Sequence, residues 1–98
     1  MGNDLNTVIK KLLQKISNQL IKKSDYENFI SCDIFFVFGS KHKTAMCDFV
    51  YGIKIISKTQ SRDNYLMSKL QSDIKSNIEN LLDVSVCCTD VIFERYSP

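Results

Sequence analysis

Apolar residues recur at intervals of three and four positions in two stretches of the chain, which is the spacing of a helix that buries one stripe. The first stretch begins close to the N-terminus, where Asn3 or Asp4 stands in position to cap a helix. In the second stretch, lysine, aspartate and glutamate fill the side opposite the apolar stripe. The spacing predicts one long helix over residues 4–23 and another over residues 62–82.

Three other stretches are rich in β-branched and aromatic residues, which are typical of strands. Residues 32–38 (CDIFFVF) are apolar on both faces and are closed by Gly39, whereas residues 45–58 alternate as in a half-buried strand. The polar segment 40–44 between them predicts a turn, so we expect a hairpin. A third strand is predicted over residues 84–93.

A short helical turn is expected between the first helix and the hairpin. Ser24 followed by Glu27 forms a capping-box pattern, which predicts a turn of helix over residues 25–30. The resulting order is helix, strand, strand, helix, strand. We therefore expect a single α+β domain over residues 1–98, a two-layer sandwich in which both long helices cover one face of a three-stranded antiparallel sheet.

The second face of such a sheet is more apolar than a solvated face should be. The residues expected to form this patch are Phe35, Val37, Val50, Ile56 and, from the last strand, Phe93. A patch of this kind marks an interaction surface on a soluble monomer. Two interpretations stay open: the tail, the short helix or strong twist covers the patch within the chain, or a second subunit or partner covers it.

The four cysteines predict a reducing environment. Cys32, Cys47, Cys87 and Cys88 show neither the spacing of a disulfide framework nor paired CxxC motifs, and three of them lie in apolar or β-rich stretches, where a free thiol behaves as a small hydrophobe. A vicinal disulfide or a zinc site is the weaker alternative. We expect a cytoplasmic protein, in the host cytoplasm or nucleus if it is viral, because lysine-, isoleucine- and asparagine-rich usage is typical of AT-rich genomes such as those of many viruses and phages.

Candidate catalytic chemistry is sparse. The one histidine, His42, lies between two lysines that would lower its pKa without orienting it. Asp33, Asp48 and Asp90 fall in or beside strands and could converge on a divalent metal, although strand carboxylates more often face solvent. Glycine-rich phosphate loops are missing from the sequence. We expect no enzyme activity, no metal and no cofactor.

The basic residues supply an alternative function. The net charge of +2 and pI near 8.3 are mild, but the first half of the chain holds most of the excess lysine. The lysines expected to contact phosphates are Lys11, Lys15, Lys41, Lys43, Lys54 and Lys58. Because lysine is a point charge, binding with little sequence preference is predicted.

Two hypotheses follow. The first is a non-enzymatic assembly or interaction protein that forms a homo-oligomer, a dimer or larger, or binds a protein partner through the apolar sheet face. The second is a small nucleic-acid-binding module. A membrane partner is not expected, because the sequence has no run near the ~18 apolar residues of a membrane span.

Overall fold

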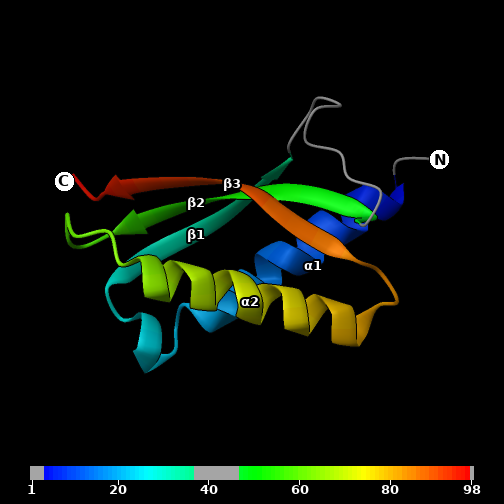
Figure 1. Ribbon diagram of the computed structural model, residues 1–98, viewed down its shortest axis with the longest axis horizontal. Helices are drawn as coiled ribbons and strands as arrows, with labels where there is room; N and C mark the ends of the chain where they lie inside the picture. The colour runs from blue at the N-terminus through cyan, green and yellow to red at the C-terminus, as the bar shows by residue number, and fades with distance from the viewer. Residues whose placement is uncertain (1–3, 37–46, 98) are drawn as a thin grey trace.

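The computed structural model describes residues 4–36 and 47–97, and Figure 1 shows their arrangement in two layers. In chain order the elements are α1 (Asp4–Leu20), the 3-10 helix η1 (Ser24–Tyr26), β1 (Phe29–Phe36), β2 (Phe49–Ser57), α2 (Asn64–Leu81) and β3 (Val86–Arg95). The α+β class expected from the sequence is confirmed.

The sheet is mixed, and the expectation of a fully antiparallel sheet is wrong. Its strand order is β1-β2-β3; β1 runs antiparallel to β2, whereas β3 runs parallel to it. The physical reason lies in α2, whose 18 residues rise about 27 Å along the sheet. This helix returns the chain to the end where β2 begins, so that Val86 pairs with Phe49. Strand, helix and strand thus form a crossover unit of the kind that joins parallel strands.

The expected capping box does not form. The N-cap position of η1 is Lys23, which makes no side-chain cap hydrogen bond, and the 3-10 turn spans three residues. The chain then enters β1 at Phe29, three residues earlier than predicted. By contrast α2 has a side-chain cap, because the carboxylate of Asp63 accepts a hydrogen bond of 3.1 Å from the backbone N–H of Leu66.

Tertiary contacts hold η1 in place of a cap. The Tyr26 side chain is buried, and its hydroxyl donates a 2.7 Å hydrogen bond to the carboxylate of Asp73 on α2. Lys69, also on α2, pairs with Asp25 at 2.7 Å and lowers the pKa of that carboxyl. The short turn is therefore fixed by packing on α2 rather than by its own sequence.

Both helices cover the same face of the sheet (Figure 1), and the core lies between the layers. The strands contribute alternate residues to it, and each helix contributes one apolar stripe. Core residues with no exposed surface are Leu13, Cys32, Ile53, Ile55, Leu70, Ile74, Ile78 and Val86. Among the described residues, no helix is long and apolar enough to cross a membrane.

Side chains of α1 bond to the outer edge of β1. The amide of Gln14 donates to the carbonyl of Cys32 at 2.9 Å and accepts from the backbone N–H of Ile34 at 2.8 Å. The hydroxyl of Ser17 donates to the same carbonyl at 3.1 Å. These bonds occupy backbone groups that an edge strand would otherwise offer to another strand.

Candidate interaction surface

Alternate residues of the three strands form the side of the sheet that faces away from the helices. Paired residues of neighbouring strands point to the same side, and the register pairs Lys54 with both Asp33 and Ile92. We call this surface the open sheet face; its residues are Ser31, Asp33, Phe35, Val50, Gly52, Lys54, Ile56, Cys87, Asp90, Ile92 and Glu94. Within residues 4–36 and 47–97, no helix or strand covers it (Figure 1).

The centre of the open sheet face is a phenylalanine ring lying over a glycine. Phe35 pairs with Gly52, and a Cβ built on Gly52 would come closer than 3.0 Å to three atoms of the Phe35 ring. Gly52 is buried although it belongs to the open side, because this ring covers it. The missing side chain therefore leaves room for the tip of the Phe35 ring over the central strand.

Acidic residues outnumber lysine on the open sheet face. Asp33, Asp90 and Glu94 carry negative charge, and Lys54 is the one base among the face residues. The ammonium of Lys54 lies 3.6 Å from the carboxylate of Glu94, with 41% and 52% of the two side chains exposed. An ion pair this exposed contributes little stability. With three acids against one lysine, the face has a net negative charge.

Three of the residues predicted for the interface come together here, namely Phe35, Val50 and Ile56, each partly buried. Val37 lies outside the described residues. Ile92, which is 43% exposed, completes the apolar patch and was missed.

Phe93 lies on the opposite side from its predicted place. It pairs with Ile55 and packs against the buried core. The cause is a bulge in β3, where Tyr51 pairs with Cys88 but the next residue, Gly52, pairs with Asp90. The extra residue reverses the alternation of the strand beyond it.

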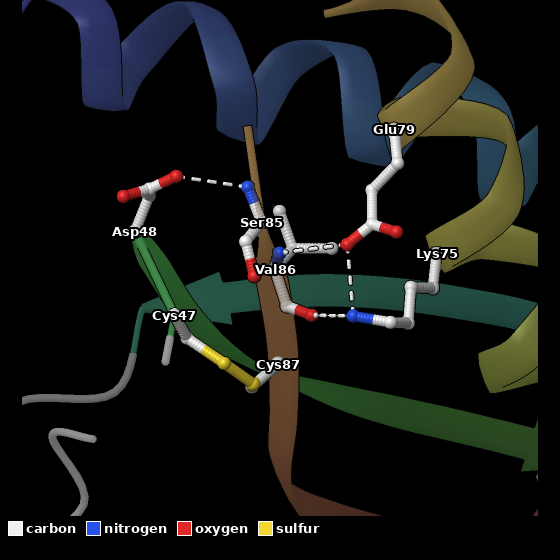
Figure 2. Close-up of a disulfide and its surroundings, with 7 residues drawn as sticks. All are labelled: Cys47, Asp48, Lys75, Glu79, Ser85, Val86 and Cys87. Carbon is white, nitrogen blue, oxygen red and sulfur yellow. Dashed lines mark hydrogen bonds and ion pairs between the residues drawn. A yellow bond between two sulfur atoms is a disulfide. The ribbon is translucent and has the colours of Figure 1, made fainter. Parts of the chain in front are cut away.

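A disulfide between Cys47 and Cys87 overturns the prediction of a reducing compartment. It joins residues 40 apart in sequence, with the Cα atoms separated by 6.0 Å, a distance that suits a disulfide. Figure 2 shows the bond linking the start of β2 to the start of β3. Because disulfides persist in oxidising environments, the expected cytoplasmic location is wrong. No spacing of cysteines along the chain predicts this bond, because neither Cys47 nor Cys87 belongs to a recognisable motif.

The other two cysteines are free thiols. Cys32 and Cys88 lie on the helix-facing side of β1 and β3, where burial raises their pKa values to about 12 and about 11 respectively. A thiol with a raised pKa holds little thiolate at neutral pH and reacts slowly. These two side chains therefore serve as core residues.

The start of β3 is bonded on its outer edge by α2 (Figure 2). The carboxylate of Glu79 accepts from the backbone N–H of Val86 at 3.2 Å, and the ammonium of Lys75 donates to the carbonyl of Val86 at 2.7 Å. Lys75 also pairs with Glu79 at 2.8 Å. The hydrogen bonds from Lys75 and from the Val86 N–H lower the pKa of Glu79. Here too outward backbone groups of an edge strand are occupied, in this case those of Val86.

A shallow groove of about 320 Å³ lies beside this edge. Its lining includes Tyr51, Gln71, Ser72 and Lys75, and burial raises the pKa of the Tyr51 hydroxyl. Glu79 already neutralises the charge of Lys75 by pairing with it. The groove therefore offers little free positive charge to a ligand. We therefore treat the open sheet face as the candidate functional surface.

The three aspartates weighed as a metal site in the sequence are used elsewhere or stand apart. The carboxylate of Asp48 accepts a 2.9 Å hydrogen bond from the backbone N–H of Ser85, while Asp33 and Asp90 belong to the open sheet face. Within the part of the chain that the structure describes, no three His, Cys, Asp or Glu side chains could hold a metal ion together.

The lysines predicted to bind nucleic acid are divided between surfaces. Lys11 and Lys15 are exposed on α1, in the helix layer, and Lys58 is exposed just beyond β2. Lys54 lies on the open sheet face beside Glu94. Lys41 and Lys43 fall outside the described residues. The described lysines are thus not gathered into one stripe.

Comparisons of the chain with protein-family models, with curated proteins and with solved structures find no match. Function must therefore be argued from the chain's own surfaces.

Proposed function

We propose that the chain is a non-enzymatic assembly protein that associates through the open sheet face, with another copy of the chain as the favoured partner. The observation that carries this proposal is the apolar patch of Phe35, Val50, Ile56 and Ile92, set among charged residues on a side of the sheet that no described element covers. An apolar centre inside a polar rim is the composition of stable protein interfaces.

The bonded strand edges support a face rather than an edge as the contact. Gln14 and Ser17 occupy outward backbone groups of β1, and Lys75 and Glu79 occupy those of Val86 in β3. Addition of a partner strand would have to break these bonds. Packing on the open sheet face breaks none of them and removes apolar surface from water.

Nucleic-acid binding is the second candidate, favoured by one observation. The helix α1 carries three lysines against one aspartate, so it presents positive charge to which a phosphate backbone would be attracted. The acidic excess of the open sheet face weakens this candidate, because it repels phosphate from the other side of the molecule. Binding of this kind would weaken steeply as salt is raised.

Light scattering on the wild type and two variants tests the proposal. Ile92→Asp places a charge in the exposed patch with little risk to the core, since Ile92 is 43% exposed. We expect wild-type mass to rise with concentration above the 11.3 kDa of one chain and Ile92→Asp to stay at one chain. The matched control, Tyr65→Asp, replaces an apolar residue that is 76% exposed on α2, and it should assemble like the wild type.

Two results would overturn the proposal. One is a wild type that stays at one chain over the whole concentration range, and the other is an Ile92→Asp variant that assembles unchanged. In either case a filter-binding assay with single-stranded DNA at low and moderate salt tests the second candidate, which predicts binding that Lys11→Glu with Lys15→Glu weakens.

A further inference from the structure

The two outer surfaces of the molecule carry opposite charge. On the open sheet face, three acids stand against one lysine, a net charge of −2. On the other side, α1 holds three lysines against one aspartate, a net charge of +2. The chain's overall charge of +2 is therefore unevenly distributed: the open sheet face is negative and α1 is positive.

Exposed residues on α1 form one line along the helix. Val8, Lys11 and Lys15 follow each other at intervals of three and four residues, so they share one side of α1, and all three are exposed. Val8 is 49% exposed, which puts an apolar group into the line of lysines. We call these three residues the α1 stripe. Figure 1 shows α1 in the helix layer, across the molecule from the open side of the sheet.

Face-to-face pairing of two open sheet faces is a poor arrangement. It would set one acidic surface against its own copy, and like charges brought together at an interface are unfavourable.

We propose that copies of this chain associate head to tail, with the α1 stripe of one copy packed on the open sheet face of the next. Lysines then meet acids, and Val8 meets the apolar patch. Each chain can then contact two neighbours, one through each surface. A contact between two different surfaces builds a ring when its rotation closes and an open chain when it does not.

This inference rests on the proposed function, and a mixing experiment separates the two. Ile92→Asp blocks the open sheet face but leaves the α1 stripe intact; Lys11→Glu with Lys15→Glu blocks the α1 stripe but leaves the sheet intact. Each variant alone should remain one chain, having lost at least tenfold in affinity for itself. An equimolar mixture should form a complex of two chains that does not grow further, because its two remaining surfaces are both blocked.

Matched controls keep the test sharp. Lys58→Glu with Arg62→Glu makes the same change in charge at two exposed positions outside both surfaces, and it should assemble like the wild type. Circular dichroism and thermal unfolding check that every variant is folded. Association of the wild type should also weaken as salt rises from about 50 to 500 mM, because exposed charges are screened.

Each alternative outcome has a distinct meaning. If the α1 variant still assembles alone while Ile92→Asp does not, the copies meet face to face; the head-to-tail inference is then wrong and the proposed function stands. If both variants stay at one chain but their mixture forms no complex, the inference also fails. If Ile92→Asp assembles normally, the proposed function itself fails.

Discussion

The two sides of the sheet use the same three strands but are stabilised in different ways. On the helix-facing side, Ile53 and Ile55 have no exposed surface, and burial of apolar groups supplies the stability. On the open side, Val50 and Ile56 remain partly exposed. Between them on the same side of β2 lie Lys54 and Gly52, which the ring of Phe35 covers. An ion pair between Lys54 and Glu94 joins β2 and β3 there.

This difference explains why the open side suits an interface. A fully solvated sheet face would carry mainly polar residues. A face buried in a core would lack charged residues such as Asp33, Lys54 and Glu94. The mixture of apolar and charged groups lets the chain fold alone and still gain from contact with a partner. It also means that substitutions on the two sides should change different properties.

The largest expected effect comes from truncating the central strand on its helix-facing side. Ile53→Ala leaves a cavity in the core and should lower the free energy of unfolding by about 2–5 kcal/mol. Ile92→Ala, on the open side, should lower it by less than about 0.5 kcal/mol, because the residue is 43% exposed. Urea unfolding of both variants, at a concentration where the wild type is one chain, measures this contrast. Equal losses would mean that the two sides do not differ.

The disulfide should contribute the next largest effect. Closing a loop between residues 40 apart restricts the unfolded chain, so reduction should lower the free energy of unfolding by about 2–4 kcal/mol. Urea unfolding with and without dithiothreitol measures it. In a Cys47→Ser, Cys87→Ser variant the reductant should have no effect, because Cys32 and Cys88 are already free. A wild type insensitive to reductant would refute the disulfide.

Local periodicity predicted most of the fold, and the two largest misses depend on long-range geometry. The helices and the buried side of β1 and β2 follow from spacing that neighbouring residues determine. Parallel pairing of β3 depends on α2 carrying the chain back along the sheet, and the place of Phe93 depends on one extra residue between Cys88 and Asp90. Neither the strand pairing nor the bulge can be predicted from the spacing of apolar residues along the chain.

The candidate surface was predictable to the same extent. Phe35, Val50 and Ile56 follow from the alternation of two strands, whereas Ile92 and Asp90 required the register of the third. The disulfide was not predictable, because two cysteines 40 residues apart meet only after both strands have paired. The acidic character of the open side likewise emerges only from strands that are distant in sequence.

The smallest of these effects tests the centre of the open side. Gly52→Ala should lower the free energy of unfolding by about 1–3 kcal/mol, because its Cβ would come closer than 3.0 Å to the ring of Phe35 and force that side chain to move. The cost should largely disappear in a Phe35→Ala background, which removes the ring, so a double-mutant cycle isolates the contact. Equal costs in both backgrounds would place the strain in the backbone instead. The displaced ring would also disturb the apolar patch. Gly52→Ala should therefore weaken self-association in the absence of urea, where the variant is fully folded, which links the shape of this one contact to the proposed assembly.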